Sequence, residues 1–165
     1  MTTLASKPLN IRHAARGDLA AMLRIEQASF ADPWTVESLA TALSLDRMRV
    51  LVAESGELRE RGGDAPSGLL GYVVALVAGT EAEIADLAVA PEARRLGIGR
   101  ALLQRILSEL REAAVQTVYL EVRESNHSAR TLYESLGFGS VGRRRGYYRS
   151  PTEDALVLRR EIGPT

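Results

Sequence analysis

The chain has 165 residues, of which 45% are hydrophobic and 25% are charged, the composition of an ordinary globular domain. Lys+Arg and Asp+Glu both number 21, so the formal net charge is zero and no overall field draws the molecule to nucleic acid or an anionic membrane. The absence of cysteine excludes a disulfide scaffold, a thiol nucleophile and cysteine metal sites. The histidines lack the spacing of a metal motif, and no apolar stretch resembles a signal segment or membrane span. We expect one cytoplasmic domain over residues 1–165, with no metal.

The N-terminal part predicts a short strand followed by two helices. Residues 1–8 are expected to form a flexible tail and residues 9–12 a strand. A helix begins near Gly17, and its apolar residues lie close to helical spacing: Leu19, Met22, Leu23, Ile25 and Ala28. Pro33 ends this helix, because proline disfavours helical geometry in the residue before it. Thr35 then caps a second helix.

Strands dominate the rest of the chain, with two further helices between them. We expect strands at residues 48–53, 69–77, 84–89 and 117–122, from residue 139 onward, and at 155–158. The run 69–77 is apolar on both faces and should be central in the sheet. Residues 56–68, which are polar and glycine-rich, predict a surface-loop insertion. The strands on either side of the helix after residue 97 should be parallel neighbours, because a helical crossover returns the chain in the same direction. The order predicts a mixed α/β (α+β) domain.

A glycine-containing basic turn precedes the third helix. Gly97 and Gly99 remove side chains where backbone N–H groups can approach a ligand closely. The helix that begins there has free N–H groups and a positive dipole end, which favour an anion. Arg94, Arg95 and Arg100 add positive charge, so the sequence predicts a site for a phosphate-bearing ligand.

Two familiar phosphate motifs fit this turn poorly. A Walker P-loop is excluded, because Arg100 and Ala101 follow Gly99 where that motif needs Lys and Ser or Thr. A dinucleotide-binding motif would have Gly or Ala at position 102, which is Leu102. Glu121 does lie about 20 residues beyond the glycines, where a ribose-binding acid would stand, so dinucleotide binding is kept as a weaker alternative.

Several motifs together resemble the GCN5-related N-acetyltransferase (GNAT) family. The resemblance rests on Arg94-x-x-Gly97-x-Gly99 after an apolar strand, on 120–123, on Asn126 and on 132–138. Pro33-Trp34 and Arg144-x-x-Tyr147-Tyr148 are similar to those family members that acetylate the N-terminal alanine of a small-subunit ribosomal protein. The resemblance covers nearly the whole chain and departs from the family in the long loop 56–68.

The resemblance implies a fold and a set of roles. The fold would be a mostly antiparallel sheet with one parallel pair of strands at the cofactor site and about four flanking helices. Acetyl-CoA would be the co-substrate, held by Leu87, Ala88, Val89, Arg94, Arg95, Leu96, Gly97, Ile98, Gly99, Arg100 and Asn126. Glu121 would be the general base and Tyr133 the general acid. Trp34, Tyr147 and Tyr148 would bind the acceptor, a protein N-terminus.

Each of these residues also has a purely structural interpretation. Glu121 lies in a strand where Val118, Leu120 and Val122 share the opposite face, so it is either a catalytic carboxylate or a salt-bridged one. Tyr133 is either a proton donor or a core residue, and Asn126 either contacts the cofactor, caps a helix, or does both.

The aromatic candidates and the basic run also have two interpretations each. Trp34 is either a wall of a substrate groove or a contact that fixes two helices to the core. Tyr147 and Tyr148 are either a lip over the acceptor or packing residues of an edge strand. The arginines at 143–145 are either a solvated strand face or a patch for an acidic or RNA-associated surface.

The function itself has two rivals. One is an acetyltransferase for a small-molecule amine or a lysine, and the other is a non-catalytic CoA-binding module. An α-amine, with a pKa near 7.7–8.0, needs a weaker base than a lysine near 10.4, which suits a carboxylate. We expect a monomer or weak dimer, without direct nucleic-acid or membrane binding.

Overall fold

The computed structural model describes residues 9–56 and 68–163. The expected tail at 1–8 and nearly all of the expected loop 56–68 lie outside the described residues. The strands are β1 (Leu9–His13), β2 (Met48–Ser55), β3 (Leu69–Ala78), β4 (Glu81–Val89), β5 (Thr117–Arg123), β6 (Gly139–Arg149) and β7 (Thr152–Glu161). The α-helices in this part of the chain are α1 (Leu19–Ser29), α2 (Val36–Ser44), α4 (Ile98–Glu112) and α5 (His127–Ser135), with short 3₁₀ turns at Arg16–Asp18 and Pro91–Ala93. None of the helices in the described residues is long and apolar enough to span a membrane.

The strands form one seven-stranded sheet in the order β1-β2-β3-β4-β5-β7-β6. Only β4 and β5 are parallel, and every other neighbouring pair is antiparallel. The expected order of elements and the parallel pair across α4 are thus confirmed. Strands β4 and β7 are longer than the sequence predicts, because their polar ends carry no apolar pattern but still take part in the ladder.

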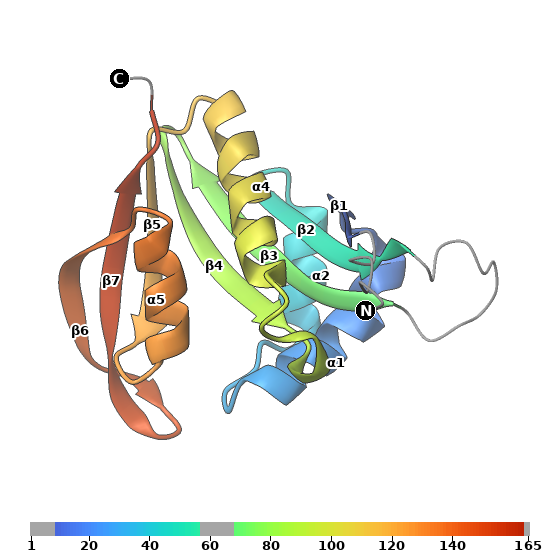
Figure 1. Cartoon of the computed structure of the whole chain (residues 1–165), viewed down its shortest axis with the longest axis horizontal. Helices are drawn as coiled ribbons and strands as arrows, with labels where there is room; N and C mark the ends of the chain where they lie inside the picture. The colour runs from blue at the N-terminus through green and yellow to red at the C-terminus, as the bar shows by residue number, and fades with distance from the viewer. Residues whose placement is uncertain (1–8, 57–67, 164–165) are drawn as a thin grey trace, which may run out of the picture.

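Helices cover both faces of the sheet. Figure 1 shows α4 in front of the central strands and α1 and α2 behind them, while α5 lies in front of β5 and β7. The core consists of fully buried side chains from these layers, among them Met22, Leu39, Leu51, Leu102, Leu103, Ile106, Leu110 and Leu120. Burial of this apolar area stabilises the fold by about 25 cal/mol for each Å² removed from water. One expectation is wrong: Ala28 is exposed, and the polar residue Glu26 takes a buried position on α1 instead.

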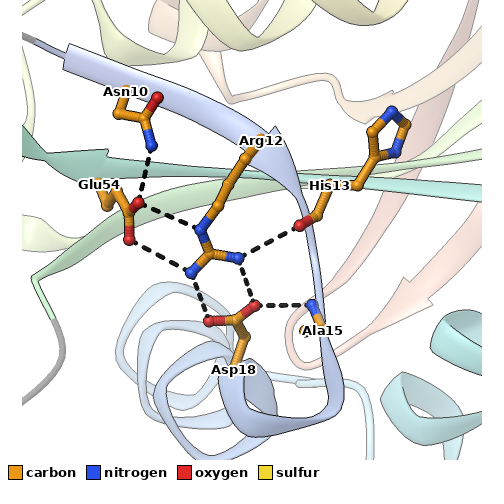
Figure 2. A network of polar contacts seen from close by, with 6 residues as sticks. All are labelled: Asn10, Arg12, His13, Ala15, Asp18 and Glu54. Carbon is orange, nitrogen blue, oxygen red and sulfur yellow. Dashed lines mark hydrogen bonds and ion pairs between the residues drawn. The ribbon is translucent and has the colours of Figure 1, made fainter. Parts of the chain in front are cut away.

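A fully engaged arginine fixes the start of α1 against the sheet edge (Figure 2). The Arg12 guanidinium binds both oxygens of Asp18, at 2.8 and 2.9 Å, and both oxygens of Glu54, at 3.1 and 3.2 Å. Its remaining N–H donates to the carbonyl of His13 at 3.2 Å, so all its N–H donors are used. Arg12 holds the pKa of the Asp18 carboxyl below its usual value. The network therefore sets where α1 begins.

Candidate active site

The two parallel strands at the centre of the sheet separate halfway along their length. Strand β4 pairs with β5 only from Glu81 to Ile84, opposite Thr117 to Leu120. Beyond that point β4 continues beside β3, and β5 continues beside β7. Figure 1 shows the two strands diverging toward their carboxyl ends. Backbone groups at the ends of β4 and β5 therefore face an opening in the sheet rather than each other.

Two local features shape the β4 side of this opening. A β-bulge places Ala85 as an extra residue opposite the Val74–Ala75 step of β3. Gly71 of β3 lies so close to β4 that a Cβ atom there would be 2.8 Å from the carbonyl oxygen of Ala88. The segment from Leu87 to Val89, which the family resemblance would assign to the cofactor, thus rests on a tightly apposed backbone.

The basic turn has the backbone geometry of an anion-binding nest. Arg95 and Gly97 both have positive φ, at 64° and 79°, on either side of Leu96. Such alternation turns successive N–H groups toward one concave side. A non-glycine residue in this conformation costs about 1–2 kcal/mol and persists where the surroundings require it. Gly97 precedes the first residue of α4, and the buried Ile98 anchors that end of the helix.

The arginines of the turn have different surroundings. Arg94 donates from Nε to the carbonyl of Val89 at 3.3 Å, which links the turn to the end of β4. Arg100 donates to the Ser135 hydroxyl at 2.8 Å and so joins α4 to α5. Arg95 is exposed and has no ion-pair or hydrogen-bond partner among the described residues. Its side chain is therefore available to a bound anion.

Glu121 lies on the face of β5 that the sequence predicts. Val118, Leu120 and Val122 are buried on the other face, and the Glu121 side chain is 15% exposed. Its carboxylate pairs with Nε of Arg144 at 2.8 Å and raises the pKa of the Tyr147 phenol. The salt-bridged arrangement considered from the sequence is thus present, and a catalytic role for Glu121 stays a prediction.

Tyr133 is a core residue whose hydroxyl is unengaged. The residue is 8% exposed, and its ring meets Phe138 edge-on, with centroids 6.0 Å apart. Burial raises the pKa of this phenol, and the nearby carboxyl of Asp86 adds to the shift. Within the described part of the chain the hydroxyl has no hydrogen-bond partner. The hydroxyl is therefore free to donate a hydrogen bond to a ligand, and its role as general acid stays a prediction.

Asn126 is confirmed as the cap of α5. Its side-chain oxygen accepts the N–H of Ala129 at 3.2 Å. The side-chain amide N–H₂ group has no partner among the described residues, so the expected cofactor contact remains compatible with the cap.

The predicted acceptor residues lie around the face that carries Glu121. Tyr147 and Tyr148 meet edge-on, with ring centroids 5.1 Å apart, in a bulged part of β6 that Gly146 turns with a φ of 59°. Arg123 of β5 lies 4.3 Å from the Tyr148 ring centroid and 4.0 Å from the carboxylate of Asp32, in the α1–α2 connection. The hairpin and this connection are therefore brought together over the end of β5.

Trp34 lies in that same connection and is partly buried against the core. This confirms its packing role and leaves its acceptor role a prediction.

The sequence interpretation missed a buried polar cluster beside the opening, made of Glu26, Tyr72 and Asp86. All three side chains are buried, and the Tyr72 hydroxyl contacts both carboxyl groups. The sequence did contain a signal for this cluster, namely an acidic residue in each of two otherwise apolar segments. Glu26 lies in the apolar helix α1, and Asp86 lies in the apolar strand β4. In the described residues no three His, Cys, Asp or Glu side chains gather as metal ligands.

Comparison with known proteins agrees with this geometry. Residues 19–138 match the acetyltransferase (GNAT) family. The chain is 35% identical over 145 residues to the ribosomal protein bS18-alanine N-acetyltransferase of Escherichia coli K12, covering 86% of this chain and 89% of that one. It is 33% identical to the N-alpha-acetyltransferase RimI of Mycobacterium tuberculosis, over 98% of each chain. The crystal structure of the Escherichia coli ribosomal-protein-S18-alanine N-acetyltransferase superposes with a TM-score of 0.84, at 32% identity over 96% of each chain. The chain is an N-acetyltransferase with the GNAT fold and belongs to the acetyltransferase (GNAT) family.

Proposed function

We propose that this chain transfers the acetyl group of acetyl-CoA to the N-terminal α-amine of a protein, and that the acceptor is a ribosomal protein whose first residue is alanine. The observation that carries the proposal is the opening between β4 and β5, with Glu121 on one side and the buried phenol of Tyr133 on the other. The relatives named for bS18-alanine acetylation support the choice of acceptor. Such an acceptor is made in the cytoplasm, where we expect this chain to act.

The described backbone supplies the elements that acetyl-CoA would need. The nest from Arg95 to Gly97 and the start of α4 would hold the pyrophosphate with N–H groups and positive charge. Free backbone groups from Leu87 to Val89 would bind the pantetheine arm along the diverging edge of β4. A backbone N–H near Val89 would polarise the acetyl carbonyl.

The reaction follows from these positions as a direct transfer in a ternary complex. The amine nitrogen forms a bond to the acetyl carbon as the bond from that carbon to the CoA sulfur breaks. The amine proton goes to Glu121, directly or through one water, and Tyr133 returns a proton to the leaving thiolate. Without a cysteine no thiol acyl-enzyme can form, and holding both substrates in register supplies most of the rate gain.

Glu121 must first be released from Arg144. The Arg144 side chain is 60% exposed, so water and salt screen this ion pair and weaken it. An arriving α-ammonium group can therefore replace the guanidinium at little cost.

The test combines acceptor preference with matched variants. A peptide that begins with alanine should be acetylated at its α-amine, whereas an N-terminally blocked lysine peptide and a polyamine should react at least about tenfold more slowly. Glu121→Gln and Tyr133→Phe should each lower kcat about 10²–10⁴-fold while CoA binding, measured by calorimetry, changes little. Glu161→Gln, at a 64% exposed side chain of β7, is the control and should keep full activity.

Each alternative function predicts a different set of results. Preference for the lysine peptide or polyamine would replace the acceptor but keep the acetyltransferase. Unchanged turnover in both Glu121→Gln and Tyr133→Phe would refute the roles of Glu121 as general base and Tyr133 as general acid. Lack of CoA binding by the unaltered chain would refute the reading of the basic turn.

A further inference from the structure

A buried chain of polar groups joins β4 to the connection between α1 and α2. Glu26 and Tyr72 are 1% and 0% exposed, and Asp86 is 9% exposed. The Tyr72 hydroxyl is hydrogen-bonded to Oε2 of Glu26 and lies 3.3 Å from Oδ2 of Asp86. The other oxygen of Glu26 accepts the backbone N–H of Trp34 at 2.9 Å. These hydrogen-bonded groups thus connect β4, beside the proposed acetyl-binding residues, to the segment that contains Trp34.

The contacts in this cluster require one proton more than a phenol and two ionised carboxylates carry. A phenol has a single proton, so it can donate to one carboxyl group only. Since this proton can serve only one of the two contacts, the other contact needs a proton from a carboxyl group. Of the described residues, the titratable groups that face Asp86 are Glu26 from α1, Tyr72 from β3 and Tyr133 from α5, none of them a cation.

The electrostatics agree with this count. Burial raises the pKa of Asp86 to about 9, and its contact with Glu26 raises it in the same direction. Burial and the two neighbouring acids raise the pKa of Tyr72, so the phenol also keeps its proton at neutral pH. Two buried carboxyl groups in contact cannot both ionise without a large cost, and one of them stays neutral.

The α1–α2 connection, which this polar cluster holds, lies on the side of the opening where the acceptor is proposed to bind. Asp32 of the same segment is 4.0 Å from Arg123, which lies two residues beyond Glu121 and contacts the ring of Tyr148. The Trp34 side chain packs against the core from this segment. The backbone position of Trp34 therefore depends on a carboxylate that is itself tied to β4.

We propose that Glu26 is a positioning residue for the acceptor, which, with Tyr72 and a protonated Asp86, fixes the Trp34 segment relative to the acetyl-binding end of β4. The assignment of an acceptor to this side rests on the proposed function. The positioning of the Trp34 segment by Glu26 does not rest on it, because these contacts hold the segment whatever the acceptor is.

The first test separates acceptor binding from cofactor binding. Glu26→Leu fills a similar volume but has no oxygen to accept the hydrogen bond from the Trp34 N–H. Loss of this hydrogen bond should raise KM for the peptide about tenfold or more. Kd for acetyl-CoA should change less than the peptide KM, because Glu26 hydrogen-bonds the Trp34 backbone directly but reaches β4 only through Tyr72 and Asp86. Glu26→Gln keeps an oxygen for the Trp34 N–H and should restore most of the peptide affinity. Equal peptide KM in Glu26→Leu and the unaltered chain would overturn the proposal.

The second test needs neither substrate nor a core substitution in α1. Trp34 is the only tryptophan in the chain, so its fluorescence reports on this segment alone. The emission and anisotropy of Trp34, excited at a wavelength that tyrosine does not absorb, should change as the pH rises through the region near 9, where Asp86 loses its proton. Asp86→Asn keeps a donor for Tyr72 and should abolish this transition while leaving the spectrum at pH 7 unaltered. A flat titration of the unaltered chain, or the same transition in Asp86→Asn, would overturn the shared proton.

The two proposals fail in distinguishable ways. If the α-amine peptide is not a substrate but the Trp34 titration is present and absent from Asp86→Asn, the proposed acceptor is wrong and the positioning stands. If the peptide reacts but Glu26→Leu leaves both its KM and the Trp34 anisotropy unchanged, the positioning is wrong and the proposed function stands.

Discussion

Asp86→Asn should make the protein more stable, and increasingly so as the pH rises. In the unfolded chain an aspartate has a pKa near 3.8, whereas burial raises the pKa of Asp86 in the fold to about 9. Between these values the folded state holds a proton that the unfolded state has lost. Stability is therefore fully present at acidic pH and falls as the pH rises, by about 1.4 kcal/mol for each pH unit at most.

The magnitude follows from that slope. Between pH 6 and pH 8 this one group should remove about 2–3 kcal/mol of unfolding free energy from the unaltered protein. Asparagine matches the shape of aspartic acid, can donate its amide N–H to Tyr72 and has no proton to lose. The gap between the variant and the unaltered protein should hence widen by that same amount over the same interval.

Urea unfolding at several pH values measures this gap directly. The comparison cancels the titration of groups that do not contact Asp86, because both proteins carry them. Two stability curves that stay parallel from pH 6 to pH 8 would show that Asp86 is not a buried protonated acid. A variant that loses stability at pH 6 would show instead that the acid makes contacts that an amide cannot replace.

Three further substitutions test the backbone and the edge of the sheet. Gly71→Ala places a Cβ atom 2.8 Å from a β4 carbonyl oxygen and should cost about 1–3 kcal/mol in urea unfolding, whereas Gly17→Ala meets nothing within 4 Å and should change little. Gly97→Ala forces a side chain into positive φ and should cost about 1 kcal/mol and raise Kd for CoA by calorimetry. Arg12→Gln should lower the unfolding free energy by about 3 kcal/mol at pH 7. In the unaltered protein the unfolding free energy should fall below about pH 4 as Asp18 is protonated, and this fall should be absent from the variant.

Periodicity and capping made much of the fold predictable. Alternation in β5 places Glu121 opposite Leu120, and the structure has it there. Thr35 and Asn126 each accept a backbone N–H at the start of a helix, as their positions predict. These features depend on residues near one another in sequence, so a pattern in the chain is enough to find them.

Contacts between distant segments were not predictable in this way. The pairing of Glu121 with Arg144 depends on how β5, β7 and the bulged β6 align, which no local pattern contains. The Glu26–Tyr72–Asp86 cluster was missed because an acid in an apolar run counts against burial unless its partners are known. Each partner comes from a different element, so only the folded sheet brings them into contact.

The divergence of β4 and β5 explains how two substrates can meet on one sheet. Tyr133 comes from α5, which with α4 and the basic turn lies in front of the sheet in Figure 1, and CoA would approach from this side. Glu121 points to the opposite face, where Arg123 reaches the α1–α2 connection, so the amine would approach from behind. In a continuous sheet these two faces would be separated by paired backbone. Because the strands part after Ile84 and Leu120, an acetyl group held between them would be accessible from both faces at once, as the proposed direct transfer in a ternary complex requires.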